Sequence, residues 1–447
     1  MKIQTRKVKP YWIAVTLAGL LFILLLCVRL DLFKEKPFDI PLNTPAESEK
    51  ETWMNIFQSG RKIGYSHRRL TPRDNGYYLF ESTFMRVNTM GIVQNIHIRT
   101  KGNLNPNYSL ASFDFDLRSS MFNFKAHGHI KDKTLYVFIG EQKLTIPADN
   151  SIYLTAGIFD AASVSGMKPD QTRTFLVFDP ATMGQRPVRV TMIGQETLDI
   201  MGHKQNTKKV SVNFVGTTQT AWIGEDGSVV REEGFMGIKL KQVAKKEALS
   251  GLNVIASQDI TKLASVSSNV TIDNPEKLTL LRIKLTGINN NIILNKGRQT
   301  FDNEILTISK EAIPDLSEIS IKKQEKLLDS RLQKPTPFIQ SDDPKMIKKV
   351  SEIVSSEDSM LIRAQKIIEW IYENIEKKPV LSIPNALETL ENRIGDCNEH
   401  AVLLAAMARA AGIPAEIEAG LVYMDGRFYY HAWNILYIGD WITADSL

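Results

Sequence analysis

The stretch that decides the fold of the C-terminal part is NALETLENRIGDCNEHA, residues 385–401. Within it, Asp396 is followed three residues later by Glu399, which is a capping-box pattern. This pattern predicts a helix that starts at Cys397 and ends before Gly412. A cysteine in the first helical turn faces unpaired backbone N–H groups and the positive end of the helix dipole. Both favour the thiolate, which is the nucleophilic form of cysteine.

Two interpretations of Cys397 follow from this position. In one it is the nucleophile of an enzyme, and in the other it is a small buried thiol that packs against Leu403 and Leu404. The Gly395-Asp396 pair favours the nucleophile, because a core cysteine has no need of a glycine and a capping residue before it. Asp396 favours the thiolate only when its carboxylate caps the backbone amides and does not point at the sulfur.

A candidate general base lies further along the chain. The runs 421–423 and 428–437 flank Asp425-Gly426, which predicts a β-hairpin. His431 is in the second of these strands. An imidazole on a rigid strand, beside a helix N-terminus, can take the thiol proton and return it to a leaving amine. Because a lone strand histidine is more often structural, the assignment needs a third group.

Asp445 is the candidate for that third group. It would accept a hydrogen bond from the imidazole N–H, which fixes the tautomer and stabilises the imidazolium. A two-residue turn at Gly439-Asp440 would make Asp445 face away from His431. A three-residue turn over 438–440 would place it opposite Trp433, diagonal to His431 and within reach. We therefore predict the three-residue turn or an equivalent bulge.

These blocks together resemble the transglutaminase-like superfamily, which has a Cys-His-Asp catalytic triad like that of papain-like proteases. The resemblance covers roughly residues 345–447 and rests on four blocks: Gly395-Asp396-Cys397, Ala411-Gly412-Ile413-Pro414-Ala415, His431-Ala432-Trp433 and Asp445. It implies that Cys397 is the nucleophile, His431 the base and Asp445 the orienting acid. It also implies an oxyanion hole that uses the backbone N–H of the cysteine and one further donor. Members commonly continue past the aspartate, so we expect the last strand here to be frayed or the sequence to be truncated.

Neither a metal nor another cofactor is expected. His400 lies three residues after Cys397 on the same helix face, and together with His431 it raises the question of a metal site. A structural zinc site requires four protein ligands, and a catalytic zinc site requires three, with further groups that orient these ligands. This set of residues falls short of that requirement.

Two helices are expected before the cysteine. Ser341-Asp342-Asp343-Pro344 supplies capping residues and a proline at the first helical position, so a helix should follow it. The next helix carries one apolar stripe, which should face the core. The stripe consists of Ala364, Ile367, Ile368, Ile371, Tyr372 and Ile375. We expect an α+β catalytic domain, papain-like or transglutaminase-like, over residues 341–447.

The region before this domain is predicted to be mostly β. Residues 51–258 contain many short strand-like runs between turn signals such as Asp74-Asn75-Gly76, which is typical of a large antiparallel sheet, either a meander or a half-open barrel. No long helical pattern interrupts them. Residues 259–310 should form a small bridging β segment, read as a sandwich, and residues 311–340 a polar linker.

The N-terminus predicts a membrane anchor. Residues 11–28 carry no charge and would span about 27 Å as a helix, close to a bilayer core of roughly 30 Å. We expect a cytoplasmic basic tail at 1–10, a transmembrane helix at 11–29 and a tether at 30–50, because the positive charges precede the apolar run. A cleaved signal peptide is the alternative, but no A-x-A-like site follows. The expected location is the inner (cytoplasmic) membrane, single-pass, with the bulk of the chain periplasmic or extracytoplasmic.

Composition limits the remaining possibilities. A chain of 447 residues suggests two or three domains. The net charge is only +5 and no long basic run with interleaved aromatics occurs, so nucleic acid is not an expected partner. The only cysteines are Cys27 and Cys397, so the exported part cannot form an internal disulfide.

Two hypotheses of function remain. The first is a thiol-dependent acyl-transfer enzyme that acts on a protein or peptide of the cell envelope, as a cysteine peptidase, an amidase or a transglutaminase. The second is a non-catalytic binding or assembly protein of the envelope, whose β domains do the work and whose C-terminal domain is vestigial.

Overall fold

The computed structural model describes residues 37–41, 48–120, 122–214, 217–251, 258–288, 292–312 and 330–447. The expected cytoplasmic tail and transmembrane helix, 1–10 and 11–29, lie outside these residues, as does most of the tether. Within the described part, no helix combines the length and the hydropathy that crossing a bilayer requires. The described chain has a mixed α+β fold with few helices and a large antiparallel sheet.

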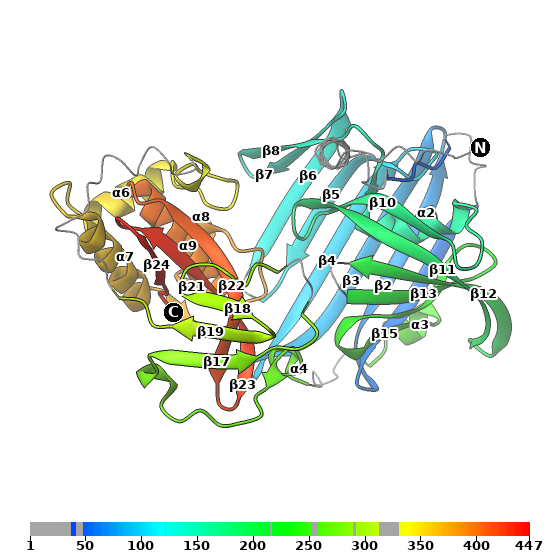
Figure 1. Cartoon of the computed structure of the whole chain (residues 1–447). Coiled ribbons are helices and arrows are strands. Elements are labelled where there is room, and N and C mark those ends of the chain that lie inside the picture. The colour runs from blue at the N-terminus through cyan, green and yellow to red at the C-terminus, as the bar shows by residue number, and fades with distance from the viewer. Residues whose placement is uncertain are drawn as a thin grey trace, which may run out of the picture.

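That sheet has 15 strands, and its spatial order is β8-β7-β6-β5-β4-β3-β2-β1-β15-β14-β13-β12-β11-β10-β9 (Figure 1). All neighbours are antiparallel except β9 and β10. The strands are β1 (Lys50–Gln58), β2 (Arg61–Arg73), β3 (Gly76–Thr89), β4 (Ile92–Leu104), β5 (Leu110–Arg118), β6 (Asn123–Lys131), β7 (Thr134–Ile139), β8 (Gln142–Pro147), β9 (Ile152–Leu154), β10 (Thr172–Asp179), β11 (Gly184–Ile200), β12 (His203–Phe214), β13 (Thr217–Ile223), β14 (Val229–Glu233) and β15 (Ile238–Gln242). The predicted large antiparallel region is confirmed.

The two edge strands of this sheet are consecutive in the chain. The chain runs outward from β1 to β8, which forms one edge, and then enters β9, which forms the other edge. Only residues 148–151 connect these two edge strands. Because an extended chain covers at most about 3.6 Å per residue, the edges cannot lie more than about 20 Å apart. A sheet of this width must therefore curve around its own core.

The core of the curved sheet is formed by side chains from both of its halves. Leu79 and Val137 come from one half and Val177 and Val210 from the other, and all four are fully buried in one cluster. The short helix α2 (Ile158–Val164), which the sequence analysis did not anticipate, adds to the same cluster.

A short segment joins the sheet to the C-terminal domain. It contains α3 (Lys245–Ala248), α4 (Ile260–Leu263), β16 (Val266–Ser267), β17 (Leu280–Lys284), β18 (Gln299–Asp302) and β19 (Ile305–Ser309). The last three strands form one sheet, in the order β17-β19-β18, so the reading as a sandwich is wrong. The apolar side chains of β17, Leu281 and Ile283, are only half-buried, and no second sheet packs on them among the described residues. Short 3₁₀ turns occur at Thr155–Gly157, Phe235–Gly237, Pro275–Lys277 and Ser330–Leu332.

The C-terminal domain packs four helices around a small sheet (Figure 1). Its elements are α6 (Pro344–Ile353), α7 (Met360–Asn374), β20 (Glu376–Lys377), α8 (Ala386–Asn392), β21 (Ile394–Gly395), α9 (Cys397–Ala410), β22 (Ala415–Met424), β23 (Arg427–Tyr437) and β24 (Trp441–Ala444). Both predicted helices form, and Asp343 caps α6 by accepting from the Lys345 amide. The stripe on α7 faces the core, with one error: Tyr372 is exposed, and the Lys377 ammonium lies over its ring.

Two apolar side chains connect the domains. Ile383, between β20 and α8, is buried in the core of the large sheet. Phe338 packs against the same core, with its ring 6.4 Å from that of Phe124. Beside them, the Gln94 amide of β4 donates to the Pro379 carbonyl over 3.0 Å. The sheet and the C-terminal domain thus share part of one core.

Candidate active site

Cys397 is the first residue of α9, as the capping box predicted. The Asp396 carboxylate accepts from the Asn398 amide at 3.0 Å, and the Asp396 amide donates to the Glu399 carboxylate at 3.0 Å. The Asp396 carboxylate therefore caps amides, the arrangement that leaves the sulfur at the positive end of the helix. Cys397 is only partly buried, whereas Leu403 of the same helix is fully buried, so the thiol does not belong to the apolar core.

Gly395 and Glu399 explain why this turn has the sequence it has. A Cβ atom added to Gly395 would lie 2.4 Å from the Glu399 Cβ, so only glycine lets the Glu399 side chain fold back over the turn. Glu399 itself is almost fully buried. Burial, followed by the charge of Asp396, raises the pKa of Glu399 to about 8. At neutral pH this carboxyl is mainly protonated, which limits the negative charge near the sulfur.

The candidate base lies on β23, in a hairpin with β22. The two strands pair from Ala415 opposite Leu436 to Met424 opposite Arg427, around a turn at Asp425-Gly426. In this register His431 lies opposite Gly420. The predicted hairpin is confirmed.

Asp445 reaches His431 because the following turn has three residues. Tyr437 pairs with Trp441, which leaves 438–440 as the turn, as predicted from strand parity. The Asp445 Oδ2 and His431 Nε2 atoms are 2.6 Å apart. The structure thus brings together the three side chains that the sequence analysis selected: a sulfur at a helix start, an imidazole on a strand and a carboxylate behind it.

The electrostatics of this group favour a charged imidazole. The hydrogen bond with Asp445, followed by the nearby Cys397, raises the pKa of His431 to about 9. Burial raises the pKa of Asp445, but the hydrogen bonds from His431 and from the Leu447 amide outweigh it and leave that pKa below its ordinary value. Because Nε2 is engaged by Asp445, Nδ1 is the ring nitrogen that remains for the sulfur. The arrangement can hold an imidazolium near Cys397 at neutral pH.

Two neighbours of this group were missed or misjudged from the sequence. The Tyr430 hydroxyl donates to the Asn398 side-chain oxygen at 2.8 Å, beside the cysteine. His400 was considered only as a metal ligand, yet its Nδ1 lies 2.8 Å from the Ser446 carbonyl oxygen, directly after Asp445. The last strand is accordingly held in place and not frayed. The i, i+3 spacing from Cys397 drew attention to His400 in the sequence, but the spacing could not predict its partner, Ser446, which lies at the far end of the domain.

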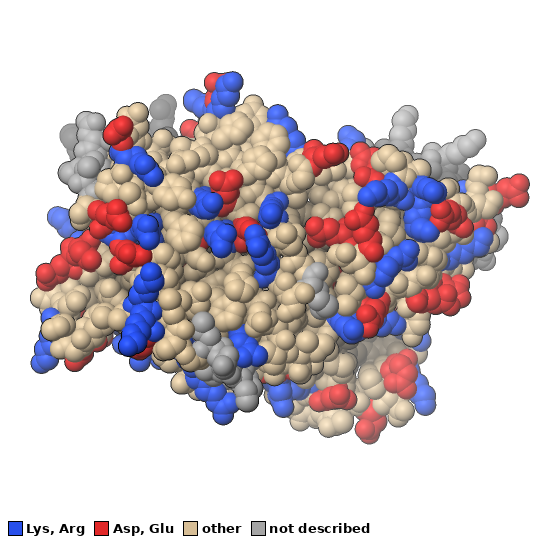
Figure 2. Space-filling model, turned by 180° about the vertical axis from the view of Figure 1, so that it is seen from behind, with Lys and Arg blue, Asp and Glu red and all other residues tan. Residues whose placement is uncertain are grey.

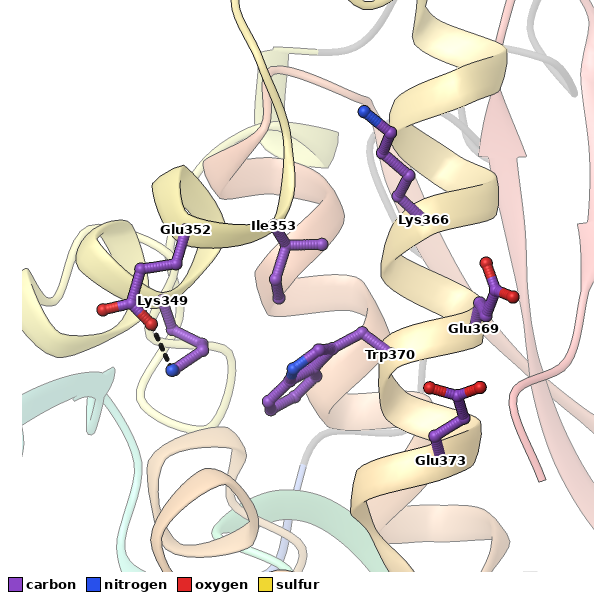
Figure 3. A pocket seen from close by; sticks show the side chains of 7 residues that line it. All are labelled: Lys349, Glu352, Ile353, Lys366, Glu369, Trp370 and Glu373. Carbon is purple, nitrogen blue, oxygen red and sulfur yellow. Dashed lines mark hydrogen bonds and ion pairs between the residues drawn. The ribbon is translucent and has the colours of Figure 1, made fainter.

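No group of three His, Cys, Asp or Glu side chains suited to a metal ion occurs among the described residues. An open surface groove of about 460 Å³ lies between α6 and α7 (Figure 3). Trp370 projects into it, and the Lys349 and Glu352 side chains form an ion pair at its α6 side. Neither Cys397 nor His431 lines this groove, so it is separate from the candidate active site.

Charge on the visible rear face is mixed. Figure 2 shows basic and acidic side chains interspersed across that face, without a large area of one sign. The small net charge of +5 is therefore not concentrated there. The expectation that nucleic acid is not a partner stays a prediction.

Comparison with known proteins identifies the C-terminal domain. Residues 347–446 match the model of the transglutaminase-like superfamily, which confirms the resemblance found in the sequence. None of the curated proteins matches the chain significantly.

Three solved structures are similar to parts of the chain. A β-barrel-like protein of the domain of unknown function DUF1849, from Brucella abortus, has 11% identity and a TM-score of 0.35 over 44% of this chain and 97% of its own. The periplasmic domain of TgpA from Pseudomonas aeruginosa has 19% identity and a TM-score of 0.22 over 27% of this chain. This match spans about half, 49%, of the TgpA domain. A DUF1089 family protein, also from Pseudomonas aeruginosa, has 12% identity and a TM-score of 0.26 over 44% of this chain and 95% of its own.

Proposed function

Since residues 347–446 form a transglutaminase-like domain, we propose that the protein is a thiol-dependent acyl-transfer enzyme with Cys397 as its nucleophile. The observation that carries the proposal is the pairing of His431 with Asp445 at 2.6 Å, with Cys397 at the start of α9 near enough to contribute to the raised pKa of the same ring. Cysteine-dependent enzymes are common in this superfamily, and the three residues match its motif one by one.

The reaction would proceed in two steps. The Cys397 thiolate attacks the carbonyl carbon of an amide or ester, and the His431 imidazolium gives its proton to the departing amine or alcohol. A C–N or C–O bond breaks and a thioester forms. His431, now neutral, takes a proton from the acceptor as it attacks the thioester, and the thiolate and imidazolium are restored. Water as acceptor completes a hydrolysis, and an amine completes a cross-link.

Hydrolysis is the outcome we favour, with a protein or peptide of the cell envelope as substrate. Water is the default acceptor unless a site excludes it, and Cys397 is partly accessible. The envelope location follows from the apolar run at 11–28 and the positive charges before it, which together favour a single-pass anchor with the bulk of the chain outside the cytoplasm.

The reactivity of Cys397 tests this proposal. An ordinary thiol has a pKa of about 8.5 and is almost fully protonated at pH 6. If the sulfur is paired with the imidazolium, iodoacetamide should label Cys397 rapidly at pH 6, and p-nitrophenyl acetate should give a burst of one p-nitrophenol per chain. With an amide substrate, whose leaving amine must take a proton from the imidazolium, the rate of acyl transfer should fall as the pH rises above about 9.

The chain offers a matched control for this experiment. Its other cysteine is Cys27, so Cys27→Ala should keep both the labelling and the burst, whereas Cys397→Ala should lose both. Labelling of Cys397 that needs the same high pH as a free cysteine, without a burst, would instead support a binding or assembly protein with a vestigial domain.

A further inference from the structure

His400 lies on α9 one turn after Cys397, and its side chain is 1% exposed. Its Nδ1 atom is 2.8 Å from the carbonyl oxygen of Ser446, which is itself 2% exposed. A carbonyl oxygen can only accept, so the proton of the imidazole must be on Nδ1. The contact joins the helix that carries the nucleophile to the end of the segment that carries the carboxylate.

The position of Ser446 gives this hydrogen bond a consequence for Asp445. The ladder between β23 and β24 ends at Asn434 and Ala444, so Asp445 follows the last paired residue. Its carboxylate receives two donors, His431 Nε2 at Oδ2 and the Leu447 amide at Oδ1 over 3.1 Å. The hydrogen bonds between β23 and β24 fix the backbone before Asp445, and the hydrogen bond from His400 to the Ser446 carbonyl fixes it after Asp445. The Asp445 carboxylate is therefore held toward His431.

The surroundings of His400 keep it neutral. Burial, with a smaller contribution from Lys377 on β20, lowers the pKa of His400, while the Ser446 carbonyl, Asp445 and Asp396 oppose that shift. Among the described residues, none hydrogen-bonds its Nε2 atom. A proton on Nε2 would therefore place an unpaired N–H and a charge in the interior, which is unfavourable.

We propose that His400, as the neutral Nδ1–H tautomer, is a positioning residue of the active site that fixes Asp445 through the Ser446 carbonyl. The proposal rests on the function proposed above and deepens it: α9 supplies both the nucleophile and the group that orders the acid. Among the described residues, the His400 ring hydrogen-bonds only the Ser446 carbonyl, so its effect on the reaction should pass through Asp445 to the orientation and the pKa of His431.

The experiment is an NMR titration of His431 in the full chain, compared among three variants. His400→Leu keeps much of the volume but removes the donor. His400→Asn keeps a donor near the place of Nδ1. Thr389→Val is the control: the Thr389 hydroxyl is fully buried and donates to the Asn385 carbonyl at 2.8 Å, but on α8, so its loss should lower stability only.

In the wild type His431 should titrate at about 9. We expect His400→Leu to lower that midpoint by about one pH unit or more, toward the ordinary value near 6.5, and to slow acyl transfer by up to about 100-fold. His400→Asn should restore most of both, and Thr389→Val should change neither. An unchanged midpoint in His400→Leu, or an equal loss in His400→Asn and His400→Leu, would overturn the proposal.

A second measurement decides the role of His400 even if the His400→Leu variant does not fold. The ¹⁵N shifts of His400 in the wild type should identify a neutral Nδ1–H ring between pH 6 and 8, and an Nε2–H or charged ring there would overturn the proposal. These readouts are independent of catalysis. If Cys397 proves unreactive, the proposed function fails while the titration still decides the role of His400.

Discussion

At the scale of single residues, the site depends on how Asp445 uses its two oxygen atoms. One accepts from His431 and the other from the Leu447 amide, so the carboxylate cannot turn away without losing both hydrogen bonds. The same residue is the largest contributor to the raised pKa of His431. Asp445 therefore orients the ring and also keeps it protonated at neutral pH.

Replacing the Asp445 carboxylate by an amide tests both roles, the orientation of the His431 ring and its protonation, while leaving Cys397 and His431 in place. Asp445→Asn should lower the midpoint of the His431 titration below about 9, because the strongest cause of its raised pKa is gone. Acyl transfer should fall by roughly 10²- to 10⁴-fold, as in other triads that lose the orienting acid. NMR titration and the burst with p-nitrophenyl acetate measure the two effects. A variant with wild-type midpoint and burst would exclude Asp445 from the site.

At the scale of elements, strand β14 has neighbouring glutamates on opposite sides of the sheet. Glu232 is half-buried on the core side of the sheet, opposite Ala221 and Leu240, and accepts from the Gln219 amide at 2.6 Å. Burial, followed by the charge of Glu81, raises the pKa of Glu232 to about 7. Glu233 forms ion pairs with Arg231 and with Lys239, which lower its pKa. Alternation along one strand thus produces pKa shifts of opposite sign.

The two glutamates should change stability in opposite directions. A carboxyl whose folded pKa is raised destabilises the fold as the pH rises from its ordinary 4.5 to about 7, and the loss persists above that range. Glu232→Gln should therefore raise the free energy of unfolding at pH 8 by about 1–3 kcal/mol and leave it unchanged at pH 4.

Glu233→Gln is the matched control on the same strand. Its lowered pKa contributes stability above pH 4.5 that is lost as the pH falls, so the substitution should cost less than about 1 kcal/mol at pH 8. Urea unfolding at pH 4 and pH 8 measures both variants. If Glu232→Gln is destabilising at pH 8, Glu232 is charged and solvated and the account of its burial is wrong.

At the scale of the whole molecule, the two large parts are linked through a shared core. Ile383 belongs to the C-terminal domain in sequence but is buried in the core of the large sheet, and Phe338 packs beside the same core. At the turn of the β22–β23 hairpin, Arg427 of β23 donates to the Ser265 and Ser267 hydroxyls, each at 2.6 Å, which ties the connecting segment to the hairpin that carries His431. The C-terminal domain is therefore attached to the rest of the chain through the shared core and through this hairpin.

Removing the Ile383 side chain tests this coupling. Ile383→Ala should cost about 2–4 kcal/mol through the cavity it leaves and should separate thermal unfolding into two transitions, one for each part. Ile362→Ala is the control, because Ile362 is 42% exposed on α7 and its loss should change stability by less than about 0.5 kcal/mol. Calorimetry of the full chain would contradict the shared core if Ile383→Ala left the trace unchanged.

Features that depend on a few neighbouring residues were determined by the sequence alone. The start of α9 follows from Asp396 and Glu399, and the β22–β23 hairpin from Asp425-Gly426, because caps and turns are closed by local hydrogen bonds. Strand parity also predicted the three-residue turn that brings Asp445 to His431. In these places the pattern and the final structure rest on the same short-range interactions.

Features that depend on which distant surfaces meet were decided only by the tertiary structure. The stripe on α7 placed Tyr372 in the core, but packing left it exposed, because the core extends over only part of that face. The order of the 15 strands, with β8 and β9 at opposite edges, and the entry of Ile383 into their core have no local signal. His400 meets Ser446 across 46 positions of the chain, and no spacing rule anticipates such a contact.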